Sequence, residues 1–175
     1  PTQRDLKDIN RLIPQIAERP HLLSMKELRR VTDQKESCRV IIARDTETGR
    51  IAGMCALTLV RVFTGLLAMV EDVVVDSNYR GMGIGPMLTK KMINVAKAKR
   101  AKHISLTTNS ARAAANAMYK KMGFFLKERV LLRGRLLSLW HHKVNYMLFS
   151  MRDIGSQQIH LRNINLLKSL LGRKC

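Results

Sequence analysis

Three glycines at alternate positions follow an arginine in the stretch YRGMGIGPML, residues 79–88. Glycine lets the backbone approach a ligand closely and turn its N–H groups toward it. The residues that follow have a helical pattern, so the positive end of a helix would point at the same place. The stretch predicts a phosphate-binding loop, with a glycine-rich turn that binds nothing as the alternative.

Two nucleotide-binding motifs do not fit this spacing. The dinucleotide fingerprint needs Gly-x-Gly-x-x-Gly and an acidic residue about 20 positions later. Here the glycines strictly alternate, and the segment 97–103, KAKRAKH, is basic. The P-loop needs four residues between its glycines and then Gly-Lys-Ser/Thr, which this stretch lacks. Pro86 costs little near a helix start but removes one phosphate donor.

The surrounding elements follow from hydrophobic periodicity and turn residues. We expect helices at 5–19 with a break at Pro14, at 24–31 with Ser24 as N-cap and Glu27 in the capping box, at 84–102, and at 110–123 with Ser110 as N-cap and Gly123 at C′. We expect strands at 37–45, 50–63, 66–76, 103–108, 124–130 and 144–151. This order predicts an α/β domain with a mixed sheet, whose first strands form hairpins and whose later strands are joined by helical crossovers.

At the glycine stretch the chain resembles the GNAT superfamily of N-acetyltransferases. That family's signature is Arg/Gln-x-x-Gly-x-Gly/Ala after a central strand, and Arg80–Gly85 matches it. The preceding EDVVVDSNY and the later TTNSARAAANAMYKKMGF are similar to neighbouring segments of the family. The resemblance covers roughly residues 2–130. It implies the GNAT fold, a central mixed sheet flanked by helices and splayed between the strands at 66–76 and 103–108.

The resemblance also implies acetyl-CoA as the cosubstrate. No metal is expected, because the sequence lacks a cluster of ligand residues. The residues expected to hold the pyrophosphate of coenzyme A are Arg80, Gly81, Met82, Gly83, Ile84 and Gly85. The backbone of Val73, Val74 and Val75 would pair with the pantetheine amides as an added strand does. Asn116 is expected to hydrogen-bond the cofactor, and Asn109 is expected either to contact it or to serve as a turn residue. A bulge commonly opens the wedge between the two strands, but the sequence does not locate one.

Two side chains are candidates for acetyl transfer to an amine. A free alkylamine titrates near 10, so a base assists the reaction at neutral pH. Period-two geometry puts Glu71 on the face of Val73 and Val75, and its position resembles that of the family's glutamate base; an ordinary strand carboxylate is the alternative. Tyr119 resembles the tyrosine that donates a proton to the departing sulfur, with packing at a helix edge as the alternative.

Composition leaves several partners open. The formal net charge is +19, which attracts polyanions such as nucleic acids, anionic membranes and phosphorylated cofactors. The main hypothesis is an acetyl-CoA-dependent N-acetyltransferase that transfers the acetyl group directly to a primary amine in a ternary complex. The alternative is a noncatalytic module of the same fold that binds nucleic acid nonspecifically. The acceptor stays open, although the glycine stretch is also similar to that of glucosamine-6-phosphate acetyltransferases.

The remaining expectations concern the chain as a whole. We expect an acetyltransferase domain at 1–151 and a basic tail at 152–175, either an amphipathic helix or disordered. His141 and His142 lie outside every matched motif. Three widely spaced cysteines favour free thiols in a cytoplasmic protein, and no run of residues is long and apolar enough to span a membrane. A homodimer is among the options for the oligomeric state.

Overall fold

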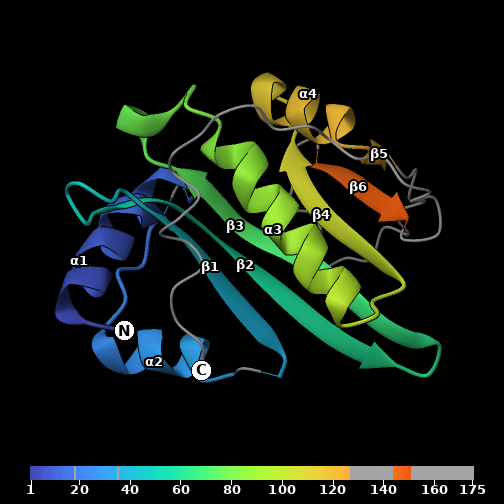
Figure 1. Ribbon diagram of the computed structural model, residues 1–175, viewed down its shortest axis with the longest axis horizontal. Helices are drawn as coiled ribbons and strands as arrows, with labels where there is room; N and C mark the ends of the chain where they lie inside the picture. The colour runs from blue at the N-terminus through green and yellow to red at the C-terminus, as the bar shows by residue number, and fades with distance from the viewer. Residues whose placement is uncertain (18, 35, 127–143, 151–175) are drawn as a thin grey trace.

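A six-stranded mixed sheet in the order β1-β2-β3-β4-β6-β5 forms the centre of the molecule (Figure 1). The structure is a computed structural model that describes residues 1–17, 19–34, 36–126 and 144–150. Its strands are β1 Cys38–Arg44, β2 Ile51–Val62, β3 Gly65–Val75, β4 His103–Asn109, β5 Phe125–Leu126 and β6 Val144–Ser150. Its helices are α1 Gln3–Leu12, α2 Met25–Thr32, α3 Ile84–Ala98 and α4 Ala113–Lys121, with 3-10 turns η1 Ile13–Gln15 and η2 Ser77–Tyr79. The expected fold class, an α/β domain with a mixed sheet, is confirmed.

The connections also follow the prediction. β1, β2 and β3 are joined as antiparallel hairpins, and α3 crosses over to β4, which lies parallel to β3. β6 then inserts between β4 and β5 and pairs antiparallel with both. Of the strand expected at 124–130 the structure describes only the first part, and the tail, His141 and His142 lie outside the described residues.

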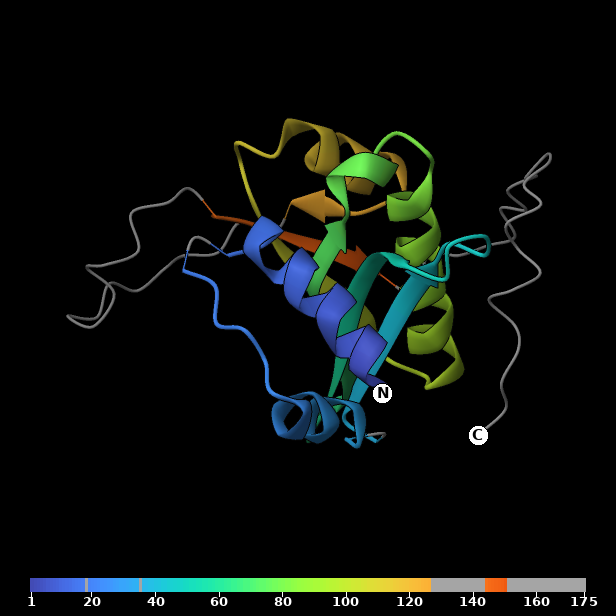
Figure 2. The same cartoon turned by 90° about the vertical axis from the view of Figure 1, so that its left-hand side faces the viewer.

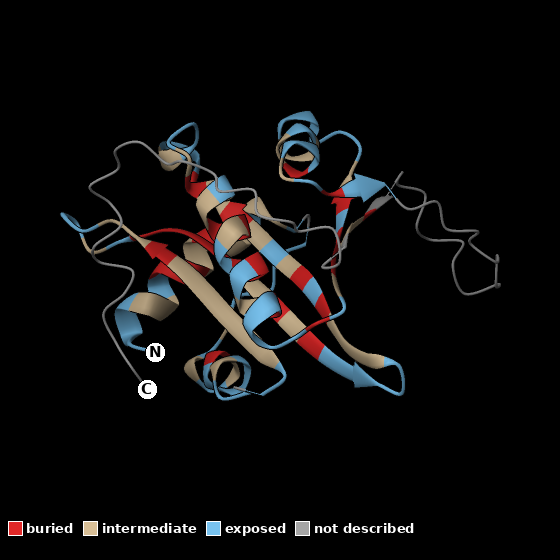
Figure 3. Cartoon of the chain, turned by 45° about the vertical axis from the view of Figure 1, so that its right-hand side comes forward, coloured by how far each residue is buried: buried red, intermediate tan, exposed pale blue. Residues whose placement is uncertain are grey.

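The helices cover both faces of the sheet and enclose two cores. Figure 2 shows α1 and α3 on opposite sides of the strands. α3 and α4 pack on one face over a core that includes Leu57, Val70, Met92 and Ile104. α1 and α2 pack on the other face around a second core made of Ile9, Leu12, Leu28, Ile51, Met54 and Val74. Figure 3 shows that β2 is buried over most of its length, whereas its end at the hairpin with β3 is exposed.

Local sequence signals explain most of the helix ends. α1 stops at Leu12 and continues as a 3-10 turn that contains Pro14, because proline cannot supply the next helical N–H. Ser24 and Glu27 form the expected capping box of α2. The expected N-cap of α4 is wrong: the cap is Arg112, without a side-chain hydrogen bond. Gly123 adopts a φ of 93° directly after the cap residue Met122, as predicted for C′.

Gly53 allows α3 to lie close to the sheet. A Cβ atom added there would be 2.9 Å from the Val74 carbonyl oxygen and 3.1 Å from a methyl carbon of Ile84. Those distances are shorter than ordinary van der Waals contact, so any larger residue would push α3 away. The start of α3 is therefore held against β2 and β3, beside the point where β3 ends.

β3 and β4 separate along their length. Their parallel pairing covers only three pairs, from Ala68 with Ile104 to Val70 with Leu106. β3 continues to Val75 and β4 to Asn109 without further pairing between them. The expected splay in the sheet is thus confirmed, and it lies between the two strands for which it was predicted.

Within the described residues, no helix has the length and apolar character needed to cross a membrane. The same residues contain no cluster of three or more histidine, cysteine, aspartate or glutamate side chains that could hold a metal ion.

Candidate active site

The wedge between β3 and β4 opens into a cleft of about 1150 Å³. Its walls are the end of β3, the loop from Tyr79 to Gly85, the end of β4 and the start of α4, and the segment 15–17 lies across it. The strand edge of β3 beyond Val70 faces this space without a β4 partner. An extended chain of amide groups could add to such an edge by backbone hydrogen bonds.

A bulge in β3 lies at Asp72. Ala56 of β2 pairs with Glu71 and Met54 pairs with Val74, so Cys55 faces two residues, Asp72 and Val73. Asp72 has a φ of 52°, which is a left-handed conformation. Aspartate adopts this conformation more readily than most residues do, and β-bulges are a common place for it. This is the bulge that the sequence did not locate, and it lies at the side of the cleft.

The bulge reverses the face of Glu71. Val70, Val73 and Val75 pack in the core beneath α3 and α4, whereas Val74 packs in the core beneath α1 and α2. Glu71 pairs directly with Ala56, and opposed residues of an antiparallel pair share a face, so it lies on the side of Val74. The prediction that Glu71 shares a face with Val73 and Val75 is wrong, because the extra residue shifts the period-two pattern.

The glycine loop has an open backbone. Gly81 and Gly83 have φ angles of 81° and 78°, and a Cβ atom added at either would meet no atom within 4 Å. Gly83 is the N-cap of α3, so the first N–H groups of the helix, at Ile84 and Gly85, lie next to this open surface. Pro86 is the third helical residue and contributes no N–H. These residues fit a diphosphate group, which such a combination of loop and helix start binds well.

Two side chains, those of Asp76 and Tyr79, fix the segment that leads into this loop. Asp76 is almost fully buried, caps η2 through its bond from the Asn78 N–H, and forms an ion pair with Arg11 of α1. Tyr79 donates a hydrogen bond of 2.7 Å from its hydroxyl to Asp45 in the turn between β1 and β2. The start of the glycine loop is therefore attached to both α1 and the first hairpin.

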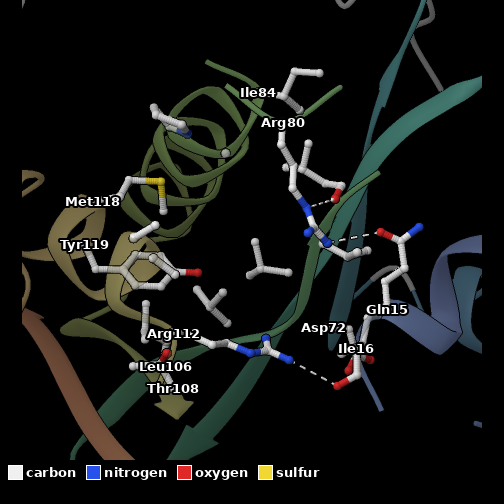
Figure 4. A pocket seen from close by; sticks show the side chains of 18 of the residues that line it. Gln15, Ile16, Asp72, Arg80, Ile84, Leu106, Thr108, Arg112, Met118 and Tyr119 are labelled. Carbon is white, nitrogen blue, oxygen red and sulfur yellow. Dashed lines mark hydrogen bonds between the residues drawn. The ribbon is translucent and has the colours of Figure 1, made fainter. Parts of the chain in front are cut away.

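Two arginines reach across the cleft (Figure 4). Arg80 donates to the side-chain oxygen of Gln15 at 3.2 Å and to the carbonyl oxygen of Val75 at 3.3 Å. Arg112 donates to the carbonyl oxygen of Ile16 at 3.2 Å. Within the described residues neither guanidinium lies in an ion pair with a carboxylate, so the cleft contains two cations bonded only to neutral oxygens.

Tyr119 projects into the cleft from α4 (Figure 4) and is 5% exposed. Burial raises the pKa of its phenol to about 12, with a further increase from Cys55 and a partial decrease from the positive charge of Arg112. The hydroxyl is therefore protonated at neutral pH. In the part of the chain that the structure describes, it has no hydrogen-bond partner.

Glu71 and Asp72 supply negative charge at the bulge. Partial burial raises the pKa of Glu71, and the neighbouring charge of Asp72 raises it further. Both residues line the cleft. A carboxylate whose pKa is moved toward neutrality is a better proton acceptor than an ordinary glutamate.

The predicted site residues divide into two groups. The cleft lining includes Tyr119, Glu71, Val73, Val74, Val75, Arg80, Gly81, Gly83, Ile84 and Gly85. It does not include Met82, Asn109 or Asn116. Asn116 instead donates to the Asn109 carbonyl oxygen at 2.9 Å, and the Asn109 side chain accepts from the Ala111 N–H at 2.8 Å. These two asparagines hold the turn that precedes α4.

Sequence reasoning missed Gln15 and Arg112 as cleft residues. Arg112 precedes the run Ala113–Ala115, whose small side chains let the start of α4 border the cleft. That run of small residues beside an arginine was the available signal. No local pattern marked Gln15, since it reaches the cleft only through the packing of α1 on the sheet.

A mixed sheet that splits beside a glycine loop and a helix start, with a buried tyrosine and a strand glutamate along the opening, defines an acyl-transferring enzyme of the N-acetyltransferase class. The model of the Acetyltransferase (GNAT) family matches residues 6–124, and the chain belongs to this family. The family predicted from the glycine stretch and its neighbouring segments is confirmed.

Individual relatives agree with this assignment. The chain is 28% identical over 132 residues to a glucosamine 6-phosphate N-acetyltransferase from Trypanosoma brucei brucei, which covers 73% of this chain and 87% of that protein. The crystal structure of a Trypanosoma brucei acetyltransferase matches with a TM-score of 0.64 and 28% identity, covering 77% of this chain and 95% of that one. A Bacillus anthracis protein solved with acetyl coenzyme A matches with a TM-score of 0.53 and 26% identity, covering 65% and 62%.

Proposed function

We propose that this chain is an acetyl-CoA-dependent N-acetyltransferase that acts on a primary amine by direct transfer in a ternary complex. The observation that carries the proposal is the cleft itself. An unpaired strand edge, a glycine loop at a helix start and a buried tyrosine line one continuous opening. The similarity to a protein solved with acetyl coenzyme A supports the same cosubstrate here.

The binding roles follow from position along the cleft. The open backbone at Gly81 and Gly83, the first N–H groups of α3 and the guanidinium of Arg80 would hold the diphosphate. The free edge of β3 at 73–75 would bond the amides of the pantetheine arm. When bound, the cosubstrate supplies an activated acetyl thioester, and the protein must orient it, remove a proton from the amine and stabilise the departing sulfur.

Glu71 is our candidate for the base. It lies on the α1 side of the sheet, next to the bulge, and its raised pKa favours proton uptake. The bulge points the Glu71 side chain away from the face that carries Val73 and Val75. An acceptor that enters from the α1 side would therefore meet this carboxylate directly or through one water molecule.

Tyr119 is our candidate for stabilising the sulfur. With a pKa of about 12 its hydroxyl keeps its proton, whereas a thiol ordinarily titrates at about 8.5. Complete proton transfer from the phenol to the thiolate is therefore uphill, and donation of a hydrogen bond is the larger expected contribution. Phenylalanine at this position would keep the packing with Phe124 and remove only the donor.

Acetyl transfer can be tested by following free thiol when acetyl-CoA and candidate amines are added. Glucosamine 6-phosphate is the first acceptor to try, because a relative is named for it. We expect thiol release with an amine, a decrease of about 10²-fold in kcat for Tyr119→Phe and Glu71→Gln, and unchanged acetyl-CoA binding in both. If calorimetry detects no binding of acetyl-CoA to the wild-type protein, the proposal fails.

The net charge of +19 favours a second candidate, a module that binds nucleic acid nonspecifically. Such binding is dominated by phosphate contacts and weakens steeply with added salt. Retention on a polyanion column near physiological salt, with an affinity that falls as salt rises, would support it. Elution below that salt concentration would reject it.

A further inference from the structure

Arg112 is a cleft cation outside the glycine loop. It is the N-cap residue of α4, but its side chain makes no capping bond and extends across the cleft instead (Figure 4). Its contact there is the Ile16 carbonyl oxygen at 3.2 Å. Within the described residues no carboxylate oxygen lies within 4.0 Å of it, so its charge is not neutralised locally.

Arg112 lines the cleft from the helix that also carries Tyr119. Arg80 belongs to the glycine loop and points to Gln15, while Arg112 points to the next residue, Ile16, from the other wall. Tyr119 follows two turns later on the same helix, and the Arg112 charge is close enough to lower the pKa of its phenol in part. One arginine thus comes from the glycine loop and the other from the helix that carries Tyr119, and both reach the segment 15–16.

Negative charge lines the same cleft. Glu71 and Asp72 line the cleft at the β3 bulge, and neither forms an ion pair within the described part of the chain. A pair of carboxylates favours an ammonium group, and a separate guanidinium favours an anion. The cleft therefore suits an acceptor that carries both an amine and an anionic group.

We propose that Arg112 binds an anionic group, phosphate or carboxylate, on the amine acceptor and so selects for acidic acceptors. The inference rests on the proposed function, because it assigns a specificity residue to that same site. The present bond to Ile16 joins a cation to a neutral carbonyl oxygen. A phosphate or carboxylate would replace it with charge-assisted hydrogen bonds, and the planar guanidinium could donate two of them in parallel to one such anion. Binding would also release the segment 15–17 from α4.

The test compares matched acceptors with and without the anion. Glucosamine 6-phosphate is paired with glucosamine for phosphate, and 6-aminohexanoate with hexylamine for carboxylate. Wild type, Arg112→Gln and Arg112→Lys are measured for kcat/KM on each, beside Arg61→Gln, an exposed arginine of β2 outside the cleft. The preference is the ratio of kcat/KM for the anionic acceptor to kcat/KM for its matched partner. We expect Arg112→Gln to lower this ratio by about 10- to 100-fold for at least one pair. Arg112→Lys should retain part of it, and Arg61→Gln all of it.

The KM for acetyl-CoA separates this role from a merely structural one. It should stay constant in Arg112→Gln, and circular dichroism should show an intact fold. Equal losses on both members of a pair, or a rise confined to the KM for acetyl-CoA, would overturn the inference. So would a wild-type enzyme that turns over the amines without an anionic group as well as those that carry one, even though the proposed function would then stand.

A binding measurement keeps the inference testable without turnover. Calorimetric titration of glucosamine 6-phosphate and 6-aminohexanoate into the wild-type protein and Arg112→Gln should show affinity that depends on Arg112 for at least one of them. Absence of that dependence overturns the inference. Absence of acetyl-CoA binding is a separate result, which would instead reject the proposed function.

Discussion

The ion pair between Arg11 and Asp76 should be a principal anchor of the site, and replacing Arg11 by methionine tests this. The Asp76 side chain is 2% exposed, and its carboxylate lies between α1 and the turn into the glycine loop. Methionine keeps much of the aliphatic length but leaves that carboxylate buried without its counter-charge. Arg11 also donates to the Ile51 carbonyl oxygen at 2.9 Å, so a second bond is lost.

The expected cost follows from this burial. Removing one partner of a buried ion pair costs about 3–5 kcal/mol. For a domain of this size each kcal/mol corresponds to about 2–4 °C in Tm, so Arg11→Met should lower Tm by about 6–20 °C. The double variant Arg11→Met with Asp76→Asn should recover most of this loss, because the amide carries no charge and its oxygen can still accept the Asn78 N–H.

The assay is urea denaturation followed by circular dichroism, with Arg50→Met as the matched control. Arg50 approaches Asp8 in the same network, but at 4.0 Å and with half of its side chain exposed. Such pairs contribute about 0–1 kcal/mol. If Arg11→Met costs no more than Arg50→Met, or if the double variant is no more stable than the single one, the ion pair does not anchor the loop as argued.

Three further predictions concern the cleft. Gly83→Ala should lower the free energy of unfolding by about 1–2 kcal/mol, because alanine is strained at a φ of 78° even though no atom lies within 4 Å of its Cβ. Asparagine tolerates that conformation better, so Gly83→Asn should cost less in the same denaturation experiment. Tyr79→Phe removes the 2.7 Å bond to Asp45, and we expect the Kd for acetyl-CoA to rise several-fold while the KM for the acceptor stays constant; a change in the acceptor KM alone would contradict this. The pKa of Glu71 is raised by burial and by Asp72, so activity should fall as pH decreases through a value above the ordinary 4.5. Asp72→Asn should move that limb of the pH–rate profile to lower pH, and an unmoved limb would exclude Glu71 as the titrating group.

The sequence predicted the elements well, because each carries its own local signal. Pro14 lies in the 3-10 turn that ends the first helix, and Ser24 with Glu27 caps the start of the second. The alternating glycines directly precede α3, as the helical pattern after them predicted. The split between β3 and β4 came from the family resemblance, and the short parallel pairing confirms it. These features depend on neighbours in sequence or on a shared motif, so no knowledge of the packing was needed.

The details that failed depend on contacts between distant segments. The N-cap of α4 is Arg112 rather than Ser110, because the turn before it is held by Asn109 and Asn116. Gln15 enters the cleft only because α1 packs on the far face of the sheet. A capping pattern read from the sequence could not anticipate either arrangement.

The bulge at Asp72 is a further feature that the sequence did not reveal, and it changes the position of the proposed base. It inserts one residue opposite Cys55, and the chain offers no glycine there to mark it. That single insertion moves Glu71 to the α1 side of the sheet while Val73 and Val75 stay beneath α3 and α4. The proposed base therefore faces the side from which Gln15 and Ile16 approach, whereas Tyr119 enters from α4. If acetyl transfer occurs between them as proposed, the amine would arrive from the α1 side and the sulfur would depart toward α4, and the bulge would set the direction of the reaction across the sheet.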